Sequence, residues 1–427
     1  MHYVIIGNGV AGATAALTIR GREPDATITM IGGESEYFFS RTALMYAYMD
    51  RLTLRDLEPY ERNVWDKQAI RRVLDWVDDL DAGKRELKLR SGASMNYDRL
   101  LLATGARPNL PPWPGMDQVR SGLVHFVSLQ DLAACESMTR PGARAVVVGG
   151  GLIGVELVEC LRHHDVDVTF LVREPWYWPV ALANEEGEMI SAHIRHNGVK
   201  LLHDELVANV LSERGQVTGI ETESGKRFEC DLLGVAVGVH PSIEWLRNVT
   251  TAPAARRGIV VSPEFRTSLD NVWAAGDCAE IEIDGEKPFV EQIWYSAKRQ
   301  GELAARAMLG DTVGYRRPIF YNSSKFFEIE YTTVGQIMAA PEEARHFYLR
   351  IPGREASLRI VEWQGAVIGF NMLGSRWNHN FFERWIAERR SLDYVVPRLR
   401  RAQFDVEFGR LDLAPVEAKW KEYEGRV

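Results

Sequence analysis

Two glycine-rich loops, each between a β-prone and a helix-prone segment, constrain what this chain can fold into. The first is GNGVAG at residues 7–12, and the second is GGGLIG at residues 149–154. The repeated order of strand, glycine turn, helix and strand predicts two βαβ units, and therefore parallel sheets. The expected elements are strands over 3–6, 26–31, 145–148 and 167–172, and helices over 13–20 and 155–162.

Both loops have the spacing G-x-G-x-x-G, which suits a dinucleotide. The first glycine allows a tight turn, the second lets the backbone approach a pyrophosphate, and the third lets the helix pack close to the strand. The helix N-terminus then offers free N–H groups and a partial positive charge to the phosphate. The residues expected to contact cofactors are Gly7, Gly9, Val10, Ala11 and Gly12 in the first loop, and Gly149, Gly151, Leu152, Ile153 and Gly154 in the second.

Polar residues after the second strand of each unit are candidates for ribose recognition. In the first unit the best candidate is Glu34, with Glu36 and a solvated turn carboxylate as alternatives. In the second unit Arg173 stands where an acid is usual, and an arginine there can face a 2′-phosphate. A charge-assisted hydrogen bond contributes roughly 1.5–3 kcal/mol, so Arg173 favours NADPH. NADH held through Glu174, or no clear preference, is the alternative.

Two further segments separate this chain from ordinary dehydrogenases. They are YDRLLLATGARP at residues 97–108 and VWAAGDCAEI at residues 272–281. In the second segment Asp277 could accept hydrogen bonds from a polyol such as ribityl, and the glycine before it permits close approach. The cofactor contacts expected from these segments and the nearby crossing are Ala103, Thr104, Gly105, Gly238, Gly276 and Asp277.

Charge and cysteine content exclude several classes of protein. The formal net charge is −8, which argues against a general nucleic-acid binder. No two of the four cysteines lie within ten residues of each other, so a disulfide scaffold, a zinc site and an iron–sulfur cluster are not expected. We predict no metal, no signal peptide, no transmembrane segment and a cytoplasmic location.

The order of the four motifs resembles the FAD- and NAD(P)-dependent pyridine nucleotide–disulfide oxidoreductase superfamily. The resemblance implies that the first loop binds FAD, that the second binds NAD(P)H and that Asp277 meets the ribityl chain. Residues 28–44 and the segment QIWYSAKRQG at 292–301 are similar to the ferredoxin, rubredoxin and putidaredoxin reductase branch, and to the flavoprotein part of assimilatory nitrite reductase. This similarity implies that FAD is also contacted by Arg41, Trp294 and Ala297.

The chain departs from that superfamily in two ways. Residues 40–43 contain no cysteine where some members have a redox cysteine, and no CxxxxC pair is present, so we expect no thiol relay. Tyr46 stands where the ferredoxin reductase branch often has a lysine that pairs with a glutamate. Glu156, just inside the second helix, is the best candidate for a catalytic group that tunes the site. A carboxylate favoured there only by the helix dipole is the alternative.

The predicted fold class is α/β, with two Rossmann-like dinucleotide-binding domains and an α+β C-terminal domain. The FAD domain is expected at 1–113 and 240–311, the NAD(P)H domain at 114–239, and the C-terminal interface domain with its helical tail at 312–427. Aromatic and β-prone residues after 311 predict an antiparallel sheet.

The helical tail has two notable features, an apolar stripe and a group of arginines. Its apolar stripe, Phe381, Phe382, Trp385 and Ile386, predicts a helix packed on its own domain, with partner docking or a membrane-surface helix as alternatives. Its arginines could attract a small acidic redox protein such as a ferredoxin, although such arginines are more often a solvated face. A homodimer formed through the C-terminal domain is a further prediction. The arginines concerned are Arg389, Arg390, Arg398, Arg400 and Arg401.

Together these features predict an FAD-dependent NAD(P)H oxidoreductase. A hydride would pass from NAD(P)H to FAD, and electrons would then pass to a ferredoxin- or rubredoxin-like protein or another acceptor, without a redox-active disulfide. The alternatives are an NAD(P)H oxidase or quinone reductase, and a nucleotide-sensing interaction flavoprotein.

Overall fold

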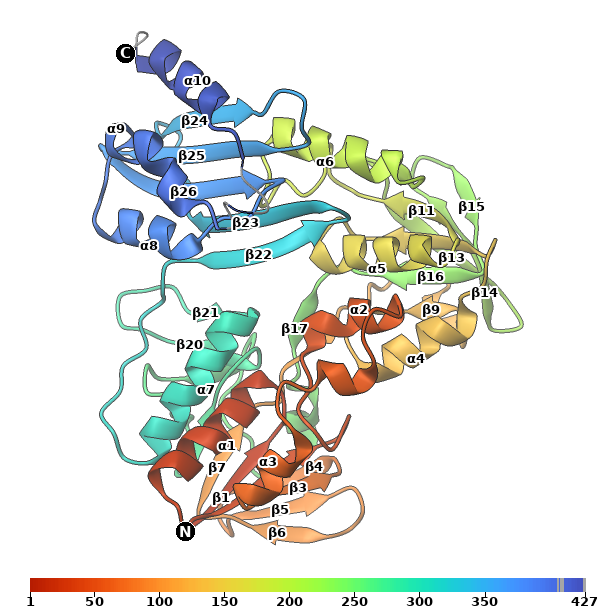
Figure 1. Cartoon of the computed structure of the whole chain (residues 1–427). Helices are drawn as coiled ribbons and strands as arrows, with labels where there is room; N and C mark the ends of the chain where they lie inside the picture. The colour runs from red at the N-terminus through yellow and green to blue at the C-terminus, as the bar shows by residue number, and fades with distance from the viewer. Residues whose placement is uncertain (405–406, 408–410, 425–427) are drawn as a thin grey trace. The chain divides into compact units, whose positions relative to one another are not determined.

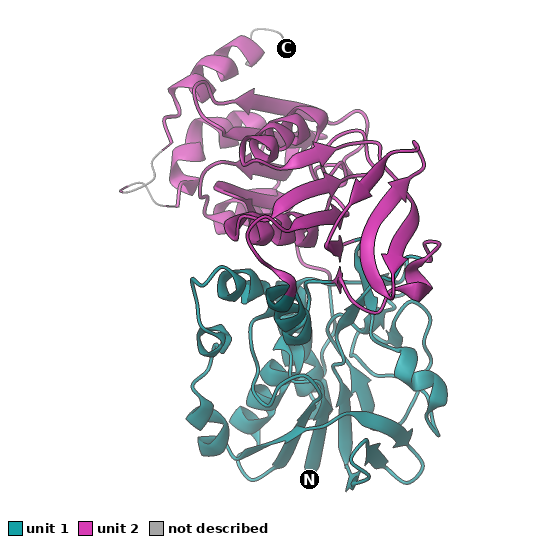
Figure 2. Cartoon of the chain, turned by 90° about the vertical axis from the view of Figure 1, so that its right-hand side faces the viewer, with its two compact units in different colours: residues 1–111, 125–137, 237–316 teal, residues 112–124, 138–236, 317–427 magenta. Residues whose placement is uncertain are grey.

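The computed structural model describes residues 1–404, 407 and 411–424, and it divides into two compact units (Figure 2). One unit comprises Met1–Pro111, His125–Ser137 and Val237–Arg316; the other comprises Pro112–Val124, Met138–Ala236 and Arg317–Val427. The second unit therefore combines the second glycine loop with the C-terminal sheet. The sequence predicted three domains, and their boundaries remain a prediction, because the division into compact units gives two.

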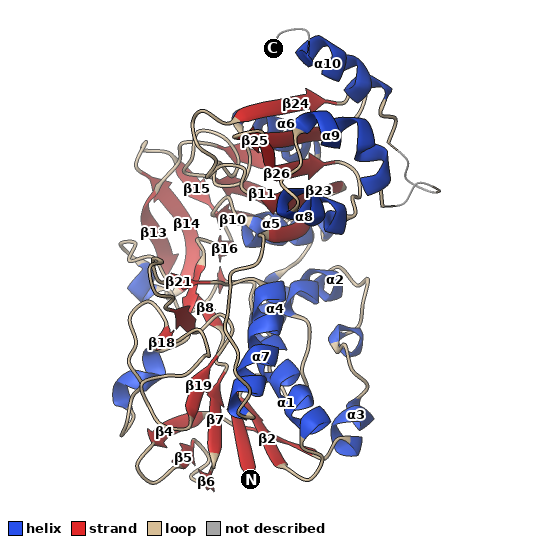
Figure 3. Cartoon of the chain, turned by 90° about the vertical axis from the view of Figure 1, so that its left-hand side faces the viewer, coloured by secondary structure: helices blue, strands red, loops and turns tan. Residues whose placement is uncertain are grey.

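The first unit is built on a five-stranded parallel sheet in the order β19-β7-β1-β2-β3. The central strand β1 pairs with β2 and β7, so that Ile6 lies between Ile31 and Leu102. Figures 1 and 3 show helices α1 and α7 side by side against this sheet. The bounds are β1 His2–Ile6, β2 Thr27–Gly32, β3 Ile70–Leu74, β7 Arg99–Leu102, β19 Val272–Ala274, α1 Val10–Arg22 and α7 Trp294–Met308.

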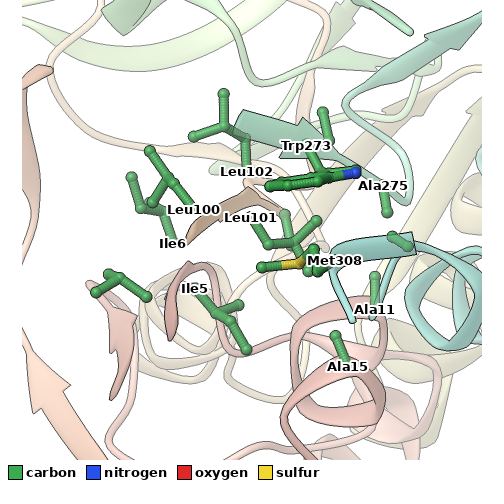
Figure 4. Packing of buried hydrophobic residues seen from close by; sticks show 14 of the residues in the cluster. Ile5, Ile6, Ala11, Ala15, Leu100, Leu101, Leu102, Trp273, Ala275 and Met308 are labelled. Atoms are coloured by element: carbon green, nitrogen blue, oxygen red, sulfur yellow. The ribbon is translucent and has the colours of Figure 1, made fainter. Parts of the chain in front are cut away.

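The core of the first unit lies between this sheet and its two helices. Figure 4 shows strand residues Ile5, Leu101 and Trp273 gathered beside Ala11 of α1 and Met308 of α7. These residues are buried because the strands carry almost continuous apolar runs, as expected for a parallel sheet that is covered on both faces. The small side chains of α1 let α7 approach closely.

Smaller elements complete the first unit. Strands β8 and β17 form an antiparallel pair, in which Val239 of β17 faces Pro108 of β8. Two small sheets and three short helices flank the main sheet. Their bounds are β4 Val77–Asp81, β5 Glu86–Leu89, β6 Ser94–Asn96, β8 Ala106–Pro108, β17 Val239–Pro241, β18 Ile259–Val261, β20 Ala279–Ile281, β21 Phe289–Val290, α2 Leu44–Tyr48, α3 Arg62–Lys67 and α4 Leu129–Met138.

The second unit contains another five-stranded parallel sheet, in the order β12-β11-β10-β16-β9. Beside it lies the antiparallel sheet β13-β14-β15. The two parallel sheets confirm the predicted Rossmann-like fold of the two βαβ units. The bounds are β9 Leu123–Val124, β10 Arg144–Val148, β11 Asp167–Leu171, β12 Lys200–Leu202, β13 Val207–Glu213, β14 Gln216–Thr222, β15 Arg227–Glu229, β16 Leu232–Val235, α5 Leu152–His163 and α6 Asn184–His196.

The remainder of the second unit is an antiparallel sheet in the order β22-β23-β26-β25-β24, with helices packed on it (Figure 1). Phe382 and Trp385 of α8 are buried in its core, which confirms the packing predicted from the apolar stripe. The predicted antiparallel sheet is confirmed as well. The bounds are β22 Tyr321–Phe326, β23 Ile329–Gly335, β24 Arg345–Arg350, β25 Ser357–Trp363, β26 Ala366–Leu373, α8 His379–Ala387, α9 Leu392–Val395 and α10 Ala414–Glu424.

Within the described residues, no helix combines the length and the apolar character that crossing a membrane requires.

Candidate functional site

In the first loop, each of the three glycines is required for a different physical reason. Gly7 has φ +107°, and a Cβ there would lie 2.0 Å from the carbonyl oxygen of Ala103. A Cβ on Gly12 would lie 2.0 Å from the carbonyl oxygen of Gly7, so this glycine lets α1 pack against the turn. A Cβ on Gly9 would have no atom within 4 Å. Gly9 therefore borders open space, as an approach to a pyrophosphate requires.

The second loop repeats this geometry. Gly149 has φ +118°, and a Cβ on Gly154 would lie 2.0 Å from the carbonyl oxygen of Gly149. A Cβ on Gly151, like one on Gly9, would have no atom within 4 Å. Gly9 and Gly151 are also the N-caps of α1 and α5, and neither helix has a side-chain cap.

Both helices consequently begin directly after the second glycine, earlier than the sequence indicated. Val10 and Ala11 lie in the first turn of α1, and Leu152 and Ile153 lie in the first turn of α5. The sequence prediction started each helix after the third glycine, because glycine has a low helix propensity. The third glycine instead lies inside the helix, where its lack of a side chain allows close packing. The first-turn N–H groups are left for a ligand to satisfy.

Two of the sequence candidates for FAD recognition outside the first loop, Glu34 and Arg41, lie together. Arg41 forms an ion pair with Glu34 at 2.7 Å and donates to the carbonyl oxygen of Val127. Glu34 also accepts from the backbone N–H of Leu129 at 2.8 Å. The alternative candidate, Glu36, instead pairs with Arg72 at 3.3 Å.

The other expected cofactor segments converge on the carboxyl ends of β7 and β19. Thr104 donates to the carbonyl oxygen of Ser242 at 2.9 Å, and Gly105 has φ +71°. Withdrawal from water raises the pKa of Asp277 to about 6, while the charge of Arg41 opposes this rise. A carboxyl group kept from water in this way is suited to accept from ligand hydroxyls.

Gly238 lies between β16 and β17, and β17 pairs with β8, the strand that follows Gly105. It has φ +95°, and its carbonyl oxygen accepts from the backbone N–H of Asn109 at 3.0 Å. Its predicted cofactor contact has no further support in the described residues.

Buried donors test whether a flavin ring fits the first unit. The side-chain N–H groups of Gln292 and Trp294 are buried and have no hydrogen-bond partner among the described residues. Such donors are costly unless a ligand satisfies them, and an isoalloxazine ring carries matching acceptor atoms. Ala297, one turn further along α7, lies 3.8 Å from the position of a Cβ on Gly276. The residues present therefore fit FAD.

The second unit contains a carboxyl group with an unusual affinity for protons, Glu156 in α5. Its loss of hydration, and then the charge of Glu159, raise its pKa to about 7, and Lys325 opposes this rise. Lys325 of β22 pairs with Glu159. The sequence indicated Glu156, but it gave no local sign that Lys325 would be brought from the C-terminal sheet.

We predict that Glu156→Gln removes a pH dependence of stability. The pKa of Glu156 is higher in the folded chain than its ordinary value of 4.5, so folding takes up a proton, and stability falls as pH rises from about 4.5 to about 7. The free energy of unfolding of the variant minus that of the parent should therefore be roughly 1–3 kcal/mol larger at pH 8 than at pH 5. Denaturant unfolding at the two pH values measures this gain.

Glu188→Gln on the exposed face of α6 is the control for that comparison. It should change stability equally at both pH values. An equal change in Glu156→Gln would contradict the assignment of the raised pKa.

Arg173 follows the second strand of the second unit. Its side chain is 76% exposed and pairs with Glu174 at 2.7 Å. The structure therefore leaves both charged groups at the end of β11, and the choice between NADPH and NADH stays a prediction.

The thiol groups of this chain are poorly suited to redox relay. All four cysteines are buried. Burial raises the pKa of Cys230 to about 12 and also raises the pKa of Cys278. A relay needs a thiolate, which forms only when the pKa is low and the sulfur is accessible.

The profile of the pyridine nucleotide-disulphide oxidoreductase family matches residues 1–308, well over half of the chain. The chain belongs to the pyridine nucleotide-disulphide oxidoreductase family. This membership confirms the resemblance drawn from the four motifs, and it supports FAD and NAD(P)H as cofactors.

Two relatives of this family member illustrate its range. The biphenyl dioxygenase system ferredoxin–NAD(+) reductase component of Paraburkholderia xenovorans is 32% identical over 316 residues, covering 72% of this chain and 75% of the relative. An NADH oxidase of Methanocaldococcus jannaschii is 30% identical over 324 residues, covering 73% and 70%. A crystal structure of the covalent putidaredoxin reductase–putidaredoxin complex shares the fold, with TM-score 0.79, 22% identity and coverage of 91% and 93%.

Proposed function

We propose that this family member is an FAD-dependent NAD(P)H oxidoreductase that delivers electrons to a small redox protein of the ferredoxin or rubredoxin kind. Bound FAD would accept a hydride from NAD(P)H and then supply the electrons that leave the protein. The observation that carries the proposal is the pair of matched loops, in which Gly9 and Gly151 both border open space at an uncapped helix N-terminus.

In this proposal the chain binds and orients cofactors rather than reacting itself. The first turns of α1 and α5 would hold the two pyrophosphates, and Arg41 and Asp277 would contact FAD. Glu156 would hold a proton near neutral pH and so tune the charge beside the second loop. The buried thiols support electron transfer without a disulfide.

The preference for a protein acceptor rests on the arginine-rich tail and on the name of one relative, a ferredoxin–NAD(+) reductase component. Arg389, Arg400 and Arg401 are exposed, and such positive charge would steer an acidic partner. Arg390 and Arg398 both lie over the ring of Tyr394, at 4.3 and 4.2 Å. A cytoplasmic location and a homodimer belong to the same proposal.

A second candidate is an oxidase, because another relative is named an NADH oxidase. An acceptor screen with excess NADH decides between the two functions. The proposal predicts faster turnover with a ferredoxin or a rubredoxin than with dioxygen or a quinone. Dioxygen consumption that matches the rate with every protein carrier would support the oxidase instead.

We predict that Arg173→Ala raises the KM for NADPH about tenfold, because one charge-assisted hydrogen bond is lost. The KM for NADH should change much less. Glu174→Ala is the paired variant, since the two side chains contact each other, and it should leave the KM for NADPH nearly unchanged. Steady-state kinetics with both nucleotides measure these effects, and equal effects of Arg173→Ala on both would remove the NADPH preference.

A further inference from the structure

Gln300 of α7 lies in the segment QIWYSAKRQG, and its side chain makes a contact that the sequence does not predict. Its side chain is fully buried, and its Oε1 accepts from the backbone N–H of Gly276 at 2.9 Å. Gly276 has φ +81° and follows the end of β19, directly before Asp277. Gln300 therefore supplies the acceptor for a backbone donor at the point where the chain turns.

The neighbours of Gln300 fix the orientation of its amide. Its Nε2 donates to Glu291 Oε2 at 3.2 Å, and the hydroxyl of Tyr315 donates to the same oxygen at 2.5 Å. The backbone N–H of Gly276 can only donate, so the amide oxygen faces Gly276 and the amide nitrogen faces Glu291. Burial raises the pKa of Tyr315, which keeps its hydroxyl a donor.

We propose that Gln300 is a positioning residue for FAD, oriented by Glu291 and Tyr315. Through the N–H of Gly276 it holds the turn that presents Asp277 to the ribityl chain. The inference rests on the proposed function, because it concerns the same cofactor. It adds three residues, Gln300, Glu291 and Tyr315, that do not touch FAD in the proposal and are not among the cofactor contacts predicted from the sequence.

The packing around this turn explains why a small displacement would matter. A Cβ on Gly276 would lie 3.0 Å from the Cβ of Ala11, and one on Gly301 would lie 2.2 Å from the carbonyl oxygen of Ala11. The turn, the first turn of α1 and α7 are thus in close contact. If the hydrogen bond from Gly276 is lost, the turn moves relative to the loop that would hold the pyrophosphate.

A carboxyl–amide exchange tests the proposal. Gln300→Glu places two carboxyl groups against each other and should weaken FAD binding by about tenfold or more. In the double variant Glu291→Gln/Gln300→Glu, the new carboxylate accepts from Gly276 and from the nitrogen of the new amide, whose second N–H can donate to the hydroxyl oxygen of Tyr315. This variant should return to within about threefold of the parent.

The measurements are the Kd of FAD for each apoprotein and the apoprotein's Tm. Rescue by the double variant supports the positioning role, because a merely structural role would change Tm and leave the Kd of the folded protein unmoved. A Kd for Gln300→Glu equal to the parent overturns the inference, as does a double variant with parental Tm and no recovery of binding.

Two further results are informative. Should Gln300→Glu not fold, the double variant alone decides: FAD binding by it supports the role, and loss of binding at parental Tm overturns it. A parent protein that binds no FAD would instead contradict the proposed function itself.

Discussion

Gly9→Leu should give a folded but colourless protein. The position has room for a side chain, since a Cβ on Gly9 would have no atom within 4 Å, so folding should be preserved. The leucine would occupy the space through which a pyrophosphate reaches the N–H groups of α1. Visible flavin absorbance after reconstitution with excess FAD, together with Tm, measures the effect.

Gly21→Leu is a matched control, because Gly21 lies in the same helix and a Cβ there also has no atom within 4 Å. It should fold and remain yellow. A yellow Gly9→Leu protein with the parental affinity for FAD would refute the assignment of the first loop.

Gly151→Leu should have the opposite phenotype: it stays yellow but is no longer reduced efficiently by NAD(P)H. The second loop has the same open geometry, so the same substitution blocks a different dinucleotide. Loss of two charge-assisted hydrogen bonds would lower kcat/KM by roughly a hundredfold or more. Stopped-flow reduction measures this loss, and dithionite, which needs no nucleotide site, should still reduce the flavin.

The two leucine variants control for each other. Loss of FAD from Gly151→Leu, or normal NAD(P)H reduction by it, would show that the two loops do not divide the cofactors as proposed.

Those parts of the fold that depend on local sequence could be predicted. The three glycines of each loop have conformations and contacts that the motif spacing implies. The β-prone segments after residue 311 predicted an antiparallel sheet, and the structure contains it. The apolar stripe of α8 likewise predicted the face that packs on its domain: Phe382 and Trp385 are buried, and Phe381 and Ile386 are partly buried against the same core.

Contacts between distant segments could not be predicted. Lys325 reaches Glu159 across 166 positions, and Gln300 reaches Gly276 only because α7 packs beside the end of β19. The distance in sequence between the two residues of each pair follows no motif, because each contact depends on how whole elements pack.

Anaerobic mixing of the FAD-loaded protein with one equivalent of NADH or NADPH tests the central claim most directly. If two dinucleotides bind to the two loops and exchange a hydride without a thiol, the visible flavin absorbance should be lost on mixing, with no other reductant present. A folded protein whose bound FAD is reduced by dithionite but by neither nucleotide would contradict this account.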